Sequence, residues 1–244
     1  MVLKRNFIFL LFVFFILGAK SQDRVTFKSS DDLEVVAHLY EMDPTYPYII
    51  LLHQGNYSKG EYKEIAISLL KLKYNCLAVD LRYGGTVNSI PNETAQNAKE
   101  KRVLRSMYDA GIDVEAAIDY IYEKSSQEVV LFGSSYSATL ALKLGMENPK
   151  VKAVIAYSPG EFFRNHFLIH DELSKTDIPV YIAGTQLEYP YLLRLTELVP
   201  KDKLVVFQPQ NDEGKHGAKA LWKKNNDVSQ EYWLSLLMFI NNIK

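Results

Sequence analysis

The stretch VVLFGSSYSATLAL, residues 129–142, decides the fold of this chain. Its four apolar residues predict a buried strand, the small residues after them predict a tight turn, and the remainder is typical of a helix. A sharp turn lifts the hydroxyl of Ser135 clear of the sheet, and the helix N-terminus offers backbone N–H groups to a developing negative charge. Ser135 is therefore a candidate nucleophile, and the alternative is that the segment is only a turn.

The N-terminus predicts export. Lys4 and Arg5 precede an almost unbroken apolar run at residues 7–17, and small residues at 19 and 21 resemble a cleavage site. This run is shorter than the roughly 20 residues of a membrane-spanning helix. We therefore expect a cleaved signal peptide at 1–21, rather than an uncleaved anchor, followed by a single domain at 22–244. The protein would be periplasmic or secreted, with no stable membrane anchor after cleavage.

Composition narrows the class of partner. The chain has 28 Lys and Arg against 29 Asp and Glu, a net charge of −1, and this balance does not suggest nucleic acid or another polyanion as partner. Cys76 is the single cysteine, which excludes an intramolecular disulfide and a cysteine metal cluster. Its apolar neighbours indicate a core position. Nothing in the composition indicates the oligomeric state.

Short apolar segments alternate with helical patterns along residues 22–244. Strands are expected at 25–27, 33–39, 48–52, 76–79, 129–132, 151–156, 180–183 and 204–207, and helices at 61–72, 109–124 and 230–243 among others. This order predicts the α/β class: a mostly parallel sheet of roughly eight strands, helices on both faces, and a short cap. In such sheets the functional groups gather in the loops directly after the strands.

A serine nucleophile needs an imidazole to accept its proton. Among the five histidines, His216 is the best candidate because it lies in the polar loop after the last expected strand. His38 lies in an early strand, and His53 comes directly after the strand at 48–52. His166 and His170, four residues apart, leave a two-histidine metal site open, although no carboxylate lies after them at a zinc-protease spacing.

A carboxylate must orient that imidazole. Glu188 is the first candidate, because it lies in the segment after the expected strand at 180–183. Asp212 is the alternative, but it shares the loop of His216. Asp171 and Asp177 precede the strand at 180–183, and Asp80 more plausibly braces the loop at 82–85.

Together the motifs HQG (53–55), DLRYGG (80–85), GSSYS (133–137), GTQLE (184–188) and KHG (215–217) resemble the dienelactone-hydrolase-like branch of α/β-hydrolases, over about residues 25–243. Dienelactone hydrolase itself uses cysteine and aspartate, so Ser135 and Glu188 make this chain similar to the serine esterases of that branch. The resemblance implies no metal and no organic cofactor. It also implies an oxyanion hole built from the amides of Gly55 and Tyr136.

Substrate recognition is less defined by the sequence. The insert at 158–178 is too short for a large helical lid, and the polar stretch at 86–106 is a candidate mobile flap. Candidate substrate-binding side chains are Gln54, Tyr83, Phe162, Phe163 and Tyr189; the aromatic ones serve equally well as packing.

These observations predict an exported serine hydrolase that cleaves small or accessible carboxylic esters through an acyl-enzyme. The partner is then a small-molecule ester. One alternative is a serine peptidase, although such peptidases usually carry an additional propeller or cap. The other is a binding or scaffold protein that has kept the fold without turnover.

Overall fold

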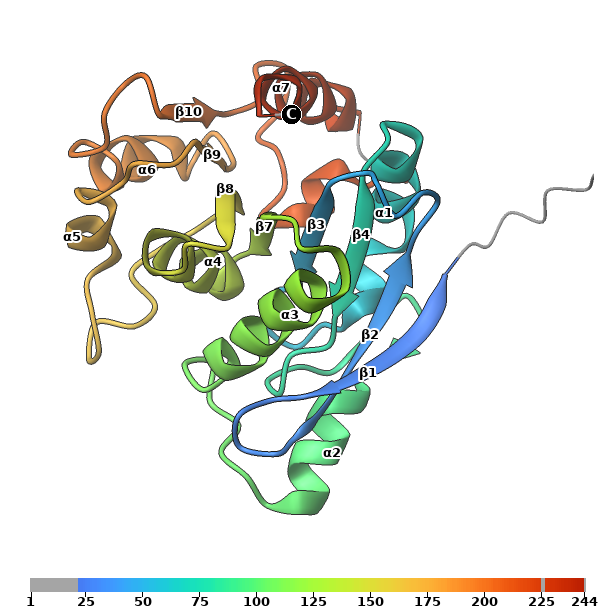
Figure 1. The fold of residues 1–244 in the computed structure, drawn as a ribbon. Coiled ribbons are helices and arrows are strands. Elements are labelled where there is room, and N and C mark those ends of the chain that lie inside the picture. Colours follow the sequence, from blue (N-terminus) through green and yellow to red (C-terminus); the bar gives the residue numbers. More distant parts are fainter. Residues whose placement is uncertain (1–21, 225–226, 244) are drawn as a thin grey trace, which may run out of the picture.

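An eight-stranded sheet forms the centre of the computed structural model, which describes residues 22–224 and 227–243 (Figure 1). The expected signal peptide lies outside the described residues. The strand order is β1-β2-β4-β3-β7-β8-β9-β10. β1 and β2 pair antiparallel, β2 pairs antiparallel with β4, and the remaining neighbours are parallel. The mostly parallel sheet predicted from the sequence is thus confirmed.

The strands coincide closely with the expected segments. They are β1 (Asp23–Lys28), β2 (Glu34–Tyr40), β3 (Tyr48–Leu52), β4 (Asn75–Val79), β7 (Val129–Ser134), β8 (Val151–Tyr157), β9 (Val180–Ala183) and β10 (Leu204–Phe207). The central strands β3, β4 and β7 are buried along their whole length. Both of their faces are covered, which explains why they are continuous apolar runs rather than alternating ones.

Helices cover both faces of the sheet. They are α1 (Lys63–Lys71), α2 (Glu93–Lys101), α3 (Ala110–Ser125), α4 (Tyr136–Glu147), α5 (Ile169–Leu173), α6 (Tyr189–Leu195) and α7 (Ser229–Asn242), with 3₁₀ turns η1 (Lys59–Tyr62) and η2 (Ala218–Leu221). The helix expected at 61–72 therefore begins as a 3₁₀ turn. Within the described ranges, no helix combines the length and apolarity needed to cross a bilayer.

Two cores lie on opposite faces of the sheet, because successive strand residues point to opposite sides. Ile50 of β3 packs in the core that α3 and α4 cover, together with Val114 and Leu140. The next residue, Leu51, packs in the core that α1 and α7 cover (Figure 1). The sheet is thereby held between two layers of helices.

The polar insert at 86–106, a candidate mobile flap from its composition, has regular structure and contacts to the sheet. It contains the short ribbon β5 (Thr86–Val87) and β6 (Ile90–Pro91), with α2 directly after it. The side chain of Asn92 caps α2 by accepting a hydrogen bond from the amide of Ala95. Thr94 Oγ1 accepts a hydrogen bond from the amide of Val36 in β2. These contacts fasten the insert to the sheet.

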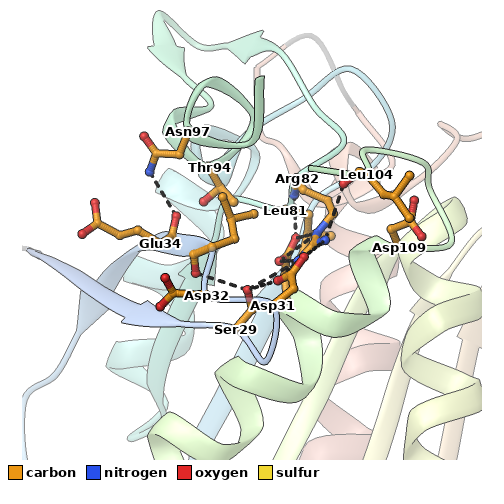
Figure 2. Close-up of polar contacts among 12 residues, drawn as sticks. Ser29, Asp31, Asp32, Glu34, Leu81, Arg82, Thr94, Asn97, Leu104 and Asp109 are labelled. Carbon is orange, nitrogen blue, oxygen red and sulfur yellow. Dashed lines mark hydrogen bonds and ion pairs between the residues drawn. The ribbon is translucent and has the colours of Figure 1, made fainter. Parts of the chain in front are cut away.

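Arg82 joins several segments in the loop after β4. Its buried guanidinium binds Asp113 of α3 at 2.8 Å and Asp31 of the β1–β2 turn at 2.7 Å. It also donates to the carbonyl of Leu104, at 3.5 Å (Figure 2). Hydrogen bonds from Arg82 hold the pKa of Asp31 at about 2, although burial opposes this shift. The loop after β4 is therefore fixed by charge pairing as well as by packing.

Replacing Asp113 by alanine leaves the Arg82 guanidinium without its buried partner. Loss of one member of a buried ion pair costs about 3–5 kcal/mol, so we expect the free energy of unfolding, measured in urea, to fall by that amount. Asp119→Ala on the same helix is the matched control, because Asp119 forms an exposed pair with Lys150 and should cost less than about 1 kcal/mol. Equal losses in the two variants would contradict this account.

Candidate active site

Ser135 occupies the turn between β7 and α4. Its backbone has φ 60° and ψ −122°, a conformation that L-residues adopt rarely and at an energetic cost. Gly133 permits the close approach of strand and helix, since a β-carbon there would lie 2.4 Å from the carbonyl oxygen of Ser137 and 2.5 Å from Cα of Ala138. The local sequence thus requires a sharp turn with Ser135 at its tip.

Ser137 stands where a second glycine is usual in such turns, and it makes specific contacts. Its buried hydroxyl lies 2.7 Å from the carbonyl oxygen of Leu52 and accepts a hydrogen bond from the amide of Ser134 at 2.9 Å. The ends of β3 and β7 are therefore joined through one side chain. The departure from glycine is compatible with the turn and strengthens its attachment to the sheet.

The structure brings together the three residues that the sequence singled out. His216 Nε2 lies 2.9 Å from Ser135 Oγ, and His216 Nδ1 lies 2.5 Å from Glu188 Oε1. The three side chains come from the segments after β7, β9 and β10, whose carboxyl ends meet at one edge of the sheet. With Nδ1–H donating to the carboxylate, Nε2 is left as the acceptor that faces the serine hydroxyl.

The carboxylate of Glu188 is held at both oxygens. Its Oε2 accepts hydrogen bonds from Ser158 Oγ at 2.8 Å and from the amide of Thr185 at 2.9 Å. Burial acts to raise the pKa of Glu188, but the hydrogen bonds from His216, Thr185 and Ser158 outweigh it and hold that pKa below its ordinary value. The ionised form, which can orient and compensate an imidazolium, is favoured.

The contacts of Ser158 and of Asp212 favour Glu188 over Asp212 as the carboxylate that orients His216. Ser158 also accepts a hydrogen bond from the amide of Gly217 at 2.9 Å, and so links the segment after β8 to the loop of His216. Asp212, the alternative from the sequence, is exposed and accepts from the amide of Gly214 at 3.0 Å. Its described hydrogen bonds stay within its own loop.

The expected oxyanion amides come from neighbouring residues in space. A β-carbon on Gly55 would lie 3.9 Å from Cδ1 of Tyr136. Among the described residues, neither the Gly55 amide nor the Tyr136 amide donates a hydrogen bond to another group. The Tyr136 amide lies at the N-terminus of α4, where the helix dipole favours negative charge.

Gln54 and His53 fix the chain just before Gly55. The carbonyl of Gln54 accepts from His53 Nδ1 at 2.8 Å, and its amide donates to Glu61 Oε2 at 2.8 Å. His53 Nε2 accepts from the amide of Leu81 at 3.0 Å, and burial lowers the pKa of His53. The nearly buried Gln54 side chain donates to Glu61 Oε1 at 3.1 Å. The peptide that precedes the Gly55 amide is held on both sides.

The aromatic candidates for substrate binding are placed differently from one another. Tyr83 packs edge-on against Tyr136, and its ring would lie 3.7 Å from a β-carbon on Gly55. Phe163 is buried in the core, Phe162 beside it is 44% exposed, and Tyr189 is partly exposed at the start of α6. Tyr83 is thus the candidate that lies against residues 53–55, the segment that we call the oxyanion loop.

The histidines of the insert have other partners. His166 stacks on Tyr108 with ring centroids 3.7 Å apart, and His170 contacts Asp171 at 3.2 Å and Glu197 at 3.3 Å. In the described part of the chain, no three His, Cys, Asp or Glu side chains are grouped as a metal site requires. The Tyr108–His166 stack joins the segment before α3 to the insert between β8 and β9.

Sequence reasoning does not single out four residues of this region. Ser158 comes directly after β8, so the rule that selects Glu188 could also have found it. Met107 lies 3.6 Å from the position of a β-carbon on Gly55, but its sequence neighbours carry no pattern that marks a site. Ser134 and Glu61 meet across 73 positions of sequence, a separation for which the chain carries no local signal.

No known sequence family and no curated protein matches the chain. Solved structures do resemble it. DcsB, solved with its substrate analogue, superposes with a TM-score of 0.72 at 15% identity, covering 92% of this chain and 100% of the other. An esterase from Pyrococcus furiosus gives 0.67 at 15%, covering 91% and 92%. Dienelactone hydrolase from Anabaena variabilis gives 0.66 at 16%, covering 92% and 100%.

These similarities show an α/β-hydrolase fold of the dienelactone-hydrolase-like kind. The fold expected from the sequence is thereby confirmed. At 12–16% identity, likenesses of this kind establish the fold alone.

The lowered pKa of Glu188 predicts how stability depends on pH. Because this pKa is lower in the folded chain, the ionised carboxylate stabilises the fold above the ordinary value near 4.5, and this contribution is lost as pH falls through the folded value. We expect the difference in unfolding free energy between wild type and Glu188→Gln to be largest near neutrality and to shrink on acidification. Chemical denaturation across the acid range measures it, with exposed Glu123→Gln controlling for the loss of one charge. A pH-independent difference would contradict the prediction.

Proposed function

We propose that the protein is a serine hydrolase that cleaves carboxylic esters through an acyl-enzyme, with Ser135 as nucleophile, His216 as general base and acid, and Glu188 as the orienting carboxylate. The observation that carries this proposal is the continuous hydrogen-bond series from Ser135 to His216 to Glu188, beginning at a strained backbone turn. This geometry suits nucleophilic catalysis, because the base contacts the nucleophile and is itself oriented by a third group.

In the acylation step, His216 Nε2 takes the proton of Ser135 Oγ as the oxygen attacks the ester carbonyl. The negative charge that develops on the carbonyl oxygen is stabilised by the amides of Gly55 and Tyr136. Glu188, ionised and held at both oxygens, balances the positive charge of the imidazolium. His216 then gives its proton to the departing alcohol, and the acyl group stays on Ser135.

In the deacylation step, His216 accepts a proton from water, which attacks the acyl carbonyl from the position that the alcohol has left. The same two amides stabilise the second oxyanion. The proton then returns to Ser135 Oγ, and the carboxylic acid departs. Every proton in this cycle passes through His216 Nε2, so the proposed chemistry is complete with the residues of this chain and one water molecule.

Small or accessible esters suit this site best. The His216 side chain is 42% exposed, and the only helix described in the insert between β8 and β9 is α5, which has five residues. A cavity of about 220 Å³ opens beside the oxyanion loop, lined by Asn56, Arg82, Tyr83, Gly84, Ala95 and Arg105. A larger cavity of about 780 Å³ lies between α1 and α7 and is lined by none of the three catalytic candidates.

Ester cleavage and export have separate support. The similar structures include proteins named as an esterase and a dienelactone hydrolase, which is consistent with ester cleavage in this chain. Export to the periplasm or medium rests on residues 1–21 alone, and an N-terminus near Gln22 in the purified protein would support it.

Ser135→Ala should abolish ester hydrolysis. Loss of the nucleophile in a serine hydrolase typically costs on the order of 10⁵–10⁶ in kcat. The measurement is turnover of a p-nitrophenyl ester series, from acetate to dodecanoate, by wild type and variant in parallel, together with labelling by a fluorophosphonate.

Equal background turnover in both proteins would reject a general esterase. Wild-type labelling without ester turnover would indicate a hydrolase of narrow specificity, and preferential turnover of a dipeptide amide would favour the peptidase alternative. A wild type that neither labels nor turns over any substrate would favour the scaffold alternative.

Met107→Ala should change the preference for acyl chain length. The Met107 side chain packs against Gly55, so its truncation opens space beside the oxyanion loop. We expect the optimum of the p-nitrophenyl series to move toward longer acyl chains, with about a 10-fold gain in relative kcat/KM, as is typical when a methylene or two fit a hydrophobic pocket. Leu104→Ala, in the same loop but 74% exposed, is the control. An unchanged optimum in Met107→Ala would place the acyl pocket elsewhere.

A further inference from the structure

Glu61 is a fully buried carboxylate that lies outside the Ser135–His216–Glu188 series. It belongs to the turn η1, which comes after the oxyanion loop. Its Oε2 accepts from the Gln54 amide at 2.8 Å, while its Oε1 accepts from Gln54 Nε2 at 3.1 Å and from Ser134 Oγ at 2.9 Å. The three groups bonded to the carboxylate are all donors, and two of them belong to the residue that precedes Gly55.

Ser134 extends these contacts to the loop of His216. Its hydroxyl accepts a hydrogen bond from the amide of Ala218 at 2.8 Å. A β-carbon on Gly217 would lie 2.6 Å from Ser134 Oγ and 3.4 Å from Nε2 of Gln54. Three parts of the chain are thus closely packed around the Glu61 carboxylate. They are the oxyanion loop, Ser134, and the segment just after His216.

We propose that Glu61 is a positioning residue of the reaction: it fixes the Gln54 peptide, and so aims the Gly55 amide at the oxyanion, while holding that loop in register with Ser134 and the segment after His216. This inference rests on the proposed function and deepens it. Glu61 touches no reacting atom in this role. Its effect reaches the transition state through the orientation of one amide.

The chemistry of Glu61 explains why a carboxylate occupies this position. Burial raises the pKa of Glu61 to about 7, although the hydrogen bonds from Gln54 and Ser134 oppose this shift. Above that pH the ionised carboxylate is an acceptor at both oxygens, so it can satisfy the three donors together. A glutamine would accept at one oxygen only and would present its amide group to a donor. A buried donor left unpaired is costly, and the Gln54 amide is the group whose displacement moves Gly55.

A purely structural role would have a different kinetic signature. If Glu61 only stabilised the fold, its replacement would lower stability and leave the rate per folded active site unchanged, or lower it equally for all substrates. If Glu61 aims the Gly55 amide, its replacement lowers the rate per folded active site mainly for reactions whose transition state has a strong hydrogen-bond acceptor at the oxyanion position. Sulfur is a much weaker acceptor than oxygen, so a thionoester is the discriminating substrate.

The experiment compares p-nitrophenyl acetate with its thionoester, in which sulfur replaces the carbonyl oxygen, for wild type and Glu61→Gln. Active sites are counted by fluorophosphonate titration. We expect kcat for the oxygen ester to fall about 10–100-fold, less than the 10²–10³ typical of deletion of an oxyanion donor. KM should stay within about threefold, and the thionoester should lose less than about threefold.

Glu41→Gln is the matched control. Glu41 is partly buried and paired with Lys124 at 3.1 Å, but it lies directly after β2, whose last residue, Tyr40, pairs with Cys76 near the start of β4, at the sheet edge opposite to the site. It should leave the ratio of oxygen-ester to thionoester rates unchanged. Glu61→Asp keeps the charge on a shorter side chain and should lower that ratio to an intermediate value, which provides a second reading if Glu61→Gln does not fold.

The outcomes separate this inference from the function on which it rests. An equal loss on both substrates in Glu61→Gln, or an unchanged ratio in Glu61→Asp, overturns the positioning role and leaves the serine hydrolase intact. A wild type that shows neither turnover nor Ser135-dependent labelling overturns the proposed function, and the inference with it. A fall of the ratio in the Glu61 variants, with Glu41→Gln unchanged, supports both.

Discussion

A β-carbon on residue 133 would lie 2.4–2.6 Å from backbone atoms of the first turn of α4, and strand and helix can approach this closely because residue 133 is glycine. The chain must then reverse direction within one residue, which places Ser135 in its strained conformation. The surrounding contacts keep that residue in place, with Ser137 bonded to the end of β3. The remaining groups of the site are arranged around this one fixed hydroxyl.

Two groups of buried ionic contacts support the loops beside it. Arg82 joins Asp113 and also Asp31 (Figure 2), while Lys59 joins Asp80 at 2.6 Å and Glu93 at 2.9 Å. Each group links segments distant in sequence, and each satisfies charges that would be costly to bury alone. The oxyanion loop is therefore bounded by rigid neighbours, which is the condition under which a small displacement of an amide has a measurable effect on rate.

The sheet and the residues at its edge could be predicted from the sequence, because both depend on short-range patterns. β3, β9 and β10 coincide with their predicted segments. β3 and β9 are buried on both faces and are therefore continuous apolar runs, while β10, at the edge of the sheet, is apolar but partly exposed. Glu188 and His216 could be predicted because each lies in the segment directly after a strand. Glu61 could not be found in this way, because its role depends on Ser134, far along the chain. The contact between the polar insert and β2 could not be found for the same reason, since Thr94 and Val36 are distant in sequence.

The exposure of His216 has a consequence for how an acyl-enzyme would be partitioned. Among the described residues, the helix of the insert between β8 and β9 has five residues, and the His216 side chain is 42% exposed. Under the proposed function, an ester on Ser135 would therefore be open to solvent. Competing nucleophiles then act in proportion to their concentration, and water, the most abundant, takes the acyl group. Under the proposed function, product release would then require no opening of a long covering segment. Such an exposed site would favour hydrolysis over acyl transfer.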